Sequence, residues 1–315
     1  MDITASKKQS SKKALSYRIL SDLFTNRYLY IMLLPVLAYY ILFHYMPMYG
    51  AIIAFKDFSP AKGIVDSNWV GLKYFSEFFN STFFVRLLRN TVLLSVYNLV
   101  YGFPAPLLLA ILLNEIRNLI FKRTVQTITY LPHFISLVVI CGIILDFTAR
   151  DGVINSIIGM FGAEPIAFMR KAEWFRTIYV STTIWQEIGW GSIVYLAALS
   201  GISQDLYEAC RIDGGGRLRQ AISITLPGIA PTTITLLILR VGRIMNIGYE
   251  KVILLYNAST YETADIISTY VYRKGLLEMS YSYSAAVGLF NSAINLMLLI
   301  AVNALSRKYS ETSLW

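Results

Sequence analysis

Charged residues are scarce in this chain of 315 residues and make up 15% of it, compared with roughly a quarter of a typical soluble domain. Apolar residues make up 56%, and the mean hydropathy is +0.53. Disordered chains have the opposite composition, so this shortage excludes disorder and argues against an ordinary soluble domain. The charges that remain carry a formal net excess of +9. On a soluble protein that excess would suggest nucleic-acid binding, whereas here it is first tested as a signal of membrane orientation.

Cysteine and histidine are also rare, with two residues of each. Cys141 falls in an apolar run and Cys210 in a polar loop, so the two should lie at different depths and a disulfide is not expected. No CxxC or zinc-ligand spacing occurs. His44 and His133 have no acid or cysteine beside them in the sequence, which favours packing or helix-end roles over a metal ligand or a general base.

Long stretches without charged residues are the main positive feature of the sequence. Five windows contain no Asp, Glu, Lys or Arg, and a sixth contains only Glu187; they are residues 28–55, 90–114, 124–145, 177–204, 220–239 and 279–306. Roughly 20 apolar helical residues cross a bilayer, and in lipid every backbone polar group must be paired within its segment. The sequence therefore predicts an all-α polytopic membrane protein. Its six transmembrane helices are expected near residues 30–54, 90–113, 125–147, 175–200, 229–248 and 285–305.

The polar ends of the chain suggest an orientation. Residues 1–27 contain six Lys or Arg against two Asp, which is typical of a cytoplasmic anchor, although a plain solvated tail is the alternative. The first apolar run is too long for a cleaved signal peptide. Six passes then place both termini in the cytoplasm; Lys and Arg counts on the two sides tie, so this orientation depends on the tail. The predicted units are a basic tail (1–27), a first helix with an outer interfacial segment (28–88), a transmembrane core (89–306) and a second tail (307–315).

The outer segment at 55–88 is rich in aromatic residues. Their spacing suits a short amphipathic helix lying at the membrane interface, and it suits packing against the first helix equally well.

One polar loop, residues 201–227, lies between the fourth and fifth predicted helices. Its first half has one apolar face, with Ser203 as a candidate N-cap and the glycines at 214–216 as the end of a short helix. A second stretch follows and is expected to stop at Pro227. Small residues on the first helix let a partner backbone come close, and Glu208 offers a carboxylate to it. The loop is therefore predicted to present a helical knob to a cytosolic partner.

The residues of this loop also match a known signature. Glu208-Ala209-Cys210, Gly214, Ile224 and Leu226-Pro227 have the spacing E-A-A-x3-G-x9-I-x-L-P, with six of its seven fixed positions matched. Cys210 replaces the second alanine and is also small. The pattern resembles the EAA loop of binding-protein-dependent ABC importer permeases of type I.

Other segments resemble the carbohydrate-uptake branch of that family. They are Leu88-Arg89-Asn90-Thr91, Leu131-Pro132, Trp185-Gln186-Glu187-Ile188-Gly189-Trp190-Gly191 and Ile212-Asp213-Gly214. Two further segments, Leu254-Leu255-Tyr256-Asn257 and Ser268-Thr269-Tyr270-Val271-Tyr272-Arg273, are similar to permeases for complex oligosaccharides. The resemblance covers residues 70–309.

The resemblance implies a permease subunit of an ATP-driven oligosaccharide importer that works by alternating access. The residues expected to couple it to an ATPase are Tyr207, Glu208, Ala209, Asp213, Gly214, Leu226 and Pro227. The implied partners are a second EAA-type permease, two ATPase subunits and an extracytoplasmic solute-binding protein in a bacterial cytoplasmic membrane, and no nucleic acid. The chain contains no G-x-x-x-x-G-K-[ST] phosphate loop, so ATP and magnesium are expected on the ATPase and no cofactor on this chain.

Polar residues within the predicted helices are the candidates for the sugar path, because sugar sites combine aromatic faces with hydrogen-bonding groups. The candidates are Trp185, Gln186, Glu187 and Trp190 on the fourth helix, Arg240, Arg243, Asn246 and Tyr249 as one stripe on the fifth, and Asn291 on the sixth. The two arginines suggest an acidic sugar such as a uronate. The alternatives are snorkelling, an ion pair of the arginines with Glu187 or Asp146, and an interhelical hydrogen bond for Asn291 and Asn295.

A membrane-embedded enzyme, such as a lipid-linked glycosyl transferase, is the alternative function. It would require convergent carboxylates or a metal site. Asp146 and Glu187 are on separate predicted helices, and the sequence contains no DxD or HExxH motif. These observations favour a transport subunit.

Overall fold

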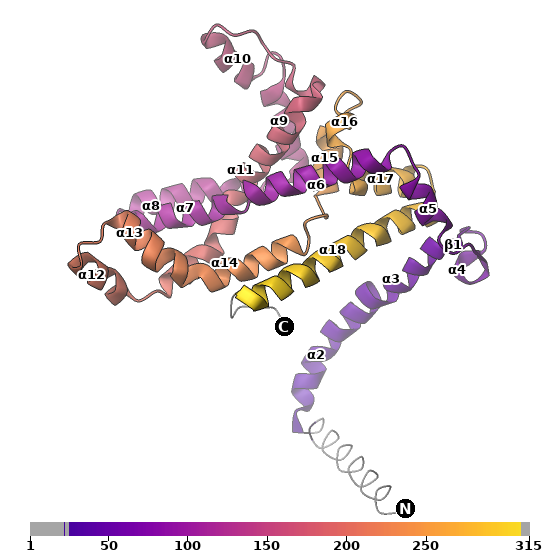
Figure 1. Cartoon of the computed structure of the whole chain (residues 1–315), viewed down its shortest axis with the longest axis horizontal. Coiled ribbons are helices and arrows are strands. Elements are labelled where there is room, and N and C mark those ends of the chain that lie inside the picture. The colour runs from indigo at the N-terminus through magenta and orange to yellow at the C-terminus, as the bar shows by residue number, and fades with distance from the viewer. Residues whose placement is uncertain (1–21, 23–24, 310–315) are drawn as a thin grey trace, which may run out of the picture.

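The structure, a computed structural model, describes residue 22 and residues 25–309. Most of these residues are helical, and several long helices run along one axis of the molecule (Figure 1). Most of the basic tail predicted at 1–27, and the end of the tail predicted at 307–315, lie outside the described residues.

Within residues 25–309, four helical segments are long and apolar enough to cross a bilayer. They are Arg27–Phe55, made of α2 (Arg27–Tyr40), η1 (Ile41–Tyr45), α3 (Met46–Met48) and η2 (Tyr49–Phe55); Phe84–Glu115, made of α6 (Phe84–Val100) and α7 (Pro104–Glu115); Arg217–Val241, made of α13 (Arg217–Gln220), η5 (Ala221–Thr225) and α14 (Leu226–Val241); and Tyr281–Lys308, within α18 (Tyr281–Tyr309). A further helix, α11 (Ala172–Ser200), has the length of a span but is more polar in its middle. The chain is thus a multi-pass helical membrane protein.

The helix predicted over 125–147 is broken. One arm consists of α8 (Leu119–Tyr130) and η3 (Leu131–Phe134), the other contains α9 (Leu137–Thr148) and α10 (Val153–Met160), and the arms meet at 103°. Pro132 lacks the N–H that a continuing helix would need, and Ser136 starts the second arm by accepting a hydrogen bond from the Val139 N–H. If this bent pair is one span, the described residues contain five spans by length and composition, so these criteria do not confirm the predicted six.

The fifth predicted helix, expected over 229–248, ends early. α14 ends at Val241, and tight turns follow, in which the Arg243 N–H donates to the Arg240 carbonyl at 3.2 Å. Gly242 and Gly248 delimit this irregular segment before α15 (Tyr249–Leu255), in keeping with the poor helix propensity of glycine. The prediction of one helical stripe was therefore wrong beyond Val241; it concerned Arg240, Arg243, Asn246 and Tyr249.

Short elements cap the two ends of the bundle. One end has a two-stranded antiparallel sheet, with Lys56 opposite Trp69, and the other has the loop helix α12 (Gln204–Ile212) beside α13 (Figure 1). The remaining elements are β1 (Lys56–Asp57), β2 (Asn68–Trp69), α4 (Gly63–Asp66), α5 (Lys73–Phe79), η4 (Phe168–Arg170), α16 (Tyr261–Ala264), α17 (Ile267–Tyr272) and η6 (Arg273–Leu277).

The aromatic segment at 55–88 packs against the rest of the protein. The Trp69 ring stacks on Phe55, the last residue of the first long helix, with centroids 5.8 Å apart. Phe78 of α5 is 1% exposed and contacts Phe84 and, at 5.5 Å between centroids, Phe290 of α18. The packing alternative is thus observed, and α18 takes part in it as well as the first helix.

The helix α11 packs against α7, α8 and α14. Its buried residues Tyr195 and Leu199 form an apolar cluster with Ala110 of α7 and Ile229 of α14. At Gly189 the helix comes so close to α8 that an added Cβ would overlap the Thr129 backbone. This contact sets the position of the α11 face that carries Gln186 and Glu187.

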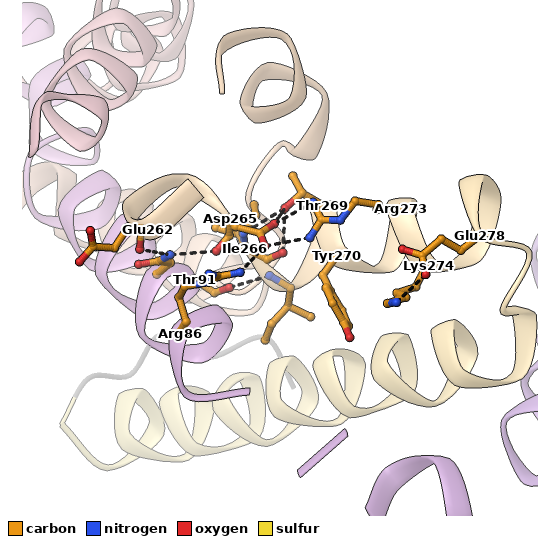
Figure 2. Close-up of polar contacts among 12 residues, drawn as sticks. Arg86, Thr91, Glu262, Asp265, Ile266, Thr269, Tyr270, Arg273, Lys274 and Glu278 are labelled. Carbon is orange, nitrogen blue, oxygen red and sulfur yellow. Dashed lines mark hydrogen bonds and ion pairs between the residues drawn. The ribbon is translucent and has the colours of Figure 1, made fainter. Parts of the chain in front are cut away.

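A buried carboxylate joins α17 to neighbouring elements (Figure 2). Asp265 is fully buried and accepts two hydrogen bonds from the Arg273 guanidinium, at 2.9 and 3.2 Å. Arg86 of α6 lies 3.4 Å from the same carboxylate, and the Thr269 hydroxyl donates to it at 2.9 Å.

The backbone of this turn is held as well. The Asn90 amide of α6 donates to the Glu262 and Asp265 carbonyls, and its oxygen accepts from Arg176 of α11 at 2.9 Å. The segment that follows α15 is therefore fixed to both α6 and α11.

The Gly189→Ala substitution should destabilise the protein, by about 1–3 kcal/mol or more, because the new methyl group meets backbone that cannot rotate away. The measurement is the unfolding temperature of the purified protein in detergent. Gly142→Ala on α9 is the matched control, since a Cβ there meets nothing within 4 Å. Equal unfolding temperatures for the two variants would contradict the packing described for α11.

The Asp265→Asn substitution should cost on the order of 3 kcal/mol, because two guanidiniums lose their counter-charge. The value falls at the lower end for a broken buried pair, since the arginine side chains remain 23% and 36% exposed. Glu278→Gln is the control; it removes the exposed partner of Lys274, a pair worth about 0–1 kcal/mol. Thermal unfolding should rank the two variants in this order, and the reverse order would refute it.

Candidate functional site

A cavity of about 790 Å³ lies between α6, α7, α11, α14 and α15, which is within the size range of small-ligand sites. Five of the residues predicted for the sugar path line it: Gln186, Glu187, Arg240, Arg243 and Asn246. Asn98, Glu250 and Lys251 add further polar groups to its wall. The structure thus brings together residues of α11, of α14 and of the turn after α14.

The two arginines of the cavity have no carboxylate partner in the part of the chain that the structure describes. The Arg240 guanidinium donates to the Asn98 side-chain oxygen at 3.1 Å, which joins α14 to α6. Within residues 25–309, no carboxylate oxygen lies within 4.0 Å of Arg240 or Arg243. The alternative ion pairs with Glu187 or Asp146 are therefore not formed.

Glu187 instead lies beside a histidine. Its Oε2 is 3.3 Å from Nδ1 of His133, and the His133 ring stacks on Trp190 with centroids 4.5 Å apart. The sequence shows no acid beside His133, but α11 passes η3 close to Gly189 and brings Glu187 to it. The stacking on Trp190 fits the packing role predicted for this histidine. Trp185 and Trp190 are 44% and 45% exposed and do not line the cavity.

The last two sugar-path candidates, Tyr249 and Asn291, lie in a second cavity of about 570 Å³ and not in the first. Tyr249 and Asn291 line it, between the end of the first long helix, α17 and α18. The Asn291 and Asn295 amides each donate to the Asn246 side-chain oxygen at 3.0 Å. Asn291 thus makes a structural hydrogen bond, as in the alternative to sugar binding, but to the irregular segment after α14 and not to a helix.

Lys251 of α15 is a residue of the first cavity that the sequence did not reveal. It is 5% exposed, its ammonium donates to the Thr183 hydroxyl at 3.0 Å, and it lies 5.4 Å from the centroid of the Tyr179 ring. Burial lowers the pKa of Lys251 from 10.5 to about 8. No motif marks this lysine, because its burial arises from the turn after α14, where a continuous helix had been expected.

The loop at 201–227 has the predicted first helix. Ser203 caps α12 by accepting from the Asp205 N–H at 3.2 Å, and Gly214, with a φ of +77°, follows the helix end in the left-handed conformation. Tyr207 is buried, and its hydroxyl lies 3.0 Å from that of Thr225. This bond ties α12 to the long helix that begins at Arg217.

The second half of the loop differs from the prediction. Helix continues from Arg217 through Val241, so Pro227 does not end it. The π-helical turn η5 directly precedes Leu226. Its wider hydrogen-bond spacing lets the helix continue past Pro227, which has no N–H to donate. Of the predicted coupling residues, Tyr207 is buried, whereas the others are exposed: Glu208, Ala209, Asp213, Gly214, Leu226 and Pro227.

Residues 102–311 match the family described as binding-protein-dependent transport system inner membrane component. The chain belongs to this family. It is a permease of the sugar-importing ABC type, which is a transport subunit set in a membrane.

Two relatives from Bacillus subtilis (strain 168) are each 46% identical to this permease. One is the protein LplB, with 92% of each chain covered; the other is the polygalacturonan/rhamnogalacturonan transport system permease protein YteP, with 96% of this chain and 95% of that protein covered. They match over nearly their whole length.

Crystal structures show the same fold. A bacterial ABC transporter involved in the import of the acidic polysaccharide alginate has a chain that matches with a TM-score of 0.86 and 42% identity, covering 92% of this permease and 99% of that chain. A bacterial alginate ABC transporter in complex with an alginate pentasaccharide-bound periplasmic protein matches with a TM-score of 0.88 and 41% identity, covering 94% and 100%.

Proposed function

We propose that this permease is one transmembrane half of an ATP-driven, binding-protein-dependent importer of acidic oligosaccharides. The observation that carries the proposal is the 790 Å³ cavity, in which Arg240 and Arg243 have no carboxylate partner among the described residues. Unpaired cations facing a cavity inside a membrane protein are costly and are typical of substrate paths. The polygalacturonan/rhamnogalacturonan and the acidic polysaccharide alginate that are named for the relatives support the same sugar class.

Six membrane passes with both termini in the cytoplasm fit this function. The four apolar spans, the bent pair at 119–160 and α11 make six crossings if the bent pair crosses once. The even number places the two ends of the chain on one side, and α12 lies at the end of the bundle opposite the β1–β2 sheet (Figure 1).

Coupling to a separate ATPase runs through α12. Its exposed face carries Glu208 and Ala209, and the bond between Tyr207 and Thr225 links it to the Arg217–Val241 helix. That helix of 25 residues is roughly 37 Å long at 1.5 Å per residue. Because Arg240 lies near its far end, a displacement of α12 by the ATPase reaches the cavity through one continuous element.

The remaining parts of the importer are other chains. They are a second EAA-type permease, two ATPase subunits that bind ATP and magnesium, and an extracytoplasmic solute-binding protein, assembled in a bacterial cytoplasmic membrane. The complex of the alginate transporter with a pentasaccharide-bound periplasmic protein supports the last of these.

Glu208→Arg and Gly214→Trp should each reduce co-purification of the ATPase subunit at least tenfold from native membranes. The first reverses the charge of the exposed loop face, and the second places a bulky side chain at a left-handed φ. Gly216→Ala is the control, since its Cβ meets nothing within 4 Å and its φ is −74°. If both variants retain the ATPase and support uptake, α12 is not the coupling element.

Arg240→Ala should reduce the preference of binding-protein-stimulated ATPase activity for oligogalacturonate over its carboxyl-reduced form about tenfold, which corresponds to about 1.4 kcal/mol for one lost charge-assisted hydrogen bond. Arg150→Ala removes an exposed arginine that does not line the cavity and should leave the preference unchanged. An unchanged preference in Arg240→Ala would refute the acidic-sugar proposal and leave the oligosaccharide importer standing.

A further inference from the structure

Lys251 is a buried lysine in the wall of the first cavity. It lies on α15, while its ammonium reaches α11, where it meets the Thr183 hydroxyl and the Tyr179 ring. All three side chains line the cavity. Lys251 is 5% exposed, so most of this residue is covered by the protein.

The partners of this ammonium are neutral. A hydroxyl and an aromatic face compensate an ammonium only in part, whereas a buried charge is normally paired with an opposite charge. In the described part of the chain no carboxylate oxygen lies within 4.0 Å of Lys251, although Glu187 and Glu250 line the same cavity. Glu187 contacts His133 instead. The site therefore holds a cation with unused capacity for an anion.

We propose that Lys251, Thr183 and Tyr179 form a carboxylate-binding subsite in the sugar path, with uronate residues as its ligand. The ammonium supplies the charge, the hydroxyl can turn to donate to a carboxylate or a ring hydroxyl, and the aromatic ring supplies an apolar face for a sugar. This inference rests on the proposed function, because it needs an oligosaccharide in the cavity. It assigns specificity to α15 and α11, in addition to the arginine side of the cavity.

The subsite holds its cation in place by contacts within the protein. The hydrogen bond to Thr183 and the position over the Tyr179 ring keep the ammonium at the wall before a ligand arrives. A preset cation loses little side-chain freedom when the carboxylate binds, so more of the interaction becomes affinity. Thr183 and Tyr179 are accordingly positioning residues as well as parts of the wall.

The test uses the complete importer, purified from native membranes through a tag on this permease and reconstituted in proteoliposomes with its binding protein. The probe is labelled trigalacturonate, with its carboxyl-reduced form as the uncharged comparison. Lys251→Met should raise the KM for trigalacturonate at least tenfold, and Lys251→Arg should keep it within about threefold of the wild type because the charge is retained. Lys171→Met removes an exposed lysine at the start of α11 and should match the wild type.

The pH dependence provides a readout that packing does not move. Since the pKa of Lys251 is about 8, the charged form is lost as the pH rises through 8, and the KM for trigalacturonate should increase several-fold between pH 7 and pH 9. The titratable and charged groups around it are Cys141 of α9, Tyr179 and Glu187 of α11, Glu250 of its own helix, and Arg240 and Arg243. Lys251→Arg stays charged, so its KM should be flat over this range.

Three results would overturn the subsite. They are a wild-type KM in Lys251→Met, an equal loss in Lys251→Met and Lys251→Arg accompanied by a lower unfolding temperature, and an equal loss of the acidic and the carboxyl-reduced sugar. A wild-type complex that imports no oligosaccharide would instead refute the proposed function itself.

Discussion

The close approach of α11 to α7 and α8 is the contact on which the rest of the cavity depends. Gly189 leaves room for the Thr129 backbone, and Gly191 meets the Pro106 side chain in the same way. With a larger residue at either position, α11 would stand farther from its neighbours. The face that carries Gln186 and Glu187 would then no longer meet Arg240 across one cavity.

The charges of the membrane core follow from that geometry. A cation or carboxylate in hydrocarbon has to face protein or a hydrated space, and the structure gives Glu187, Arg240 and Arg243 a common space to face. Below them, the continuous helix from Arg217 to Val241 joins this space to the exposed α12. The cavity and the exposed α12 thus lie at two ends of one continuous helical segment.

The absence of charge predicted the long helices well, because a span is determined by composition over 20 or more residues. The loop helix at 204–212 was also foreseeable, since Ser203 and Gly214 mark its ends by local backbone chemistry. The failures lie where tertiary contacts decide. The break near Pro132 and the early end of α14 occur inside apolar runs, and hydropathy does not detect a change of direction.

The site residues divide in the same way. Five candidates line one cavity, because polar groups within apolar helices are stabilised by facing protein or a hydrated space and not lipid. Lys251 was missed, since its place in the cavity wall depends on a partner far away in sequence, Thr183. Trp185 and Trp190 were chosen for their chemistry, yet both are partly exposed and neither lines the cavity.

The first long helix differs from every other span in its surroundings. None of its 18-residue apolar window is buried by the rest of the chain, and only its far end, η2, packs against α18. Its 29 residues extend roughly 43 Å as α-helix, compared with about 30 Å of hydrocarbon. Its apolar side chains therefore face what surrounds this chain, and bilayer thickness can change its tilt. The first cavity has no lining residue from 27–55, whereas the second is lined by Ile53.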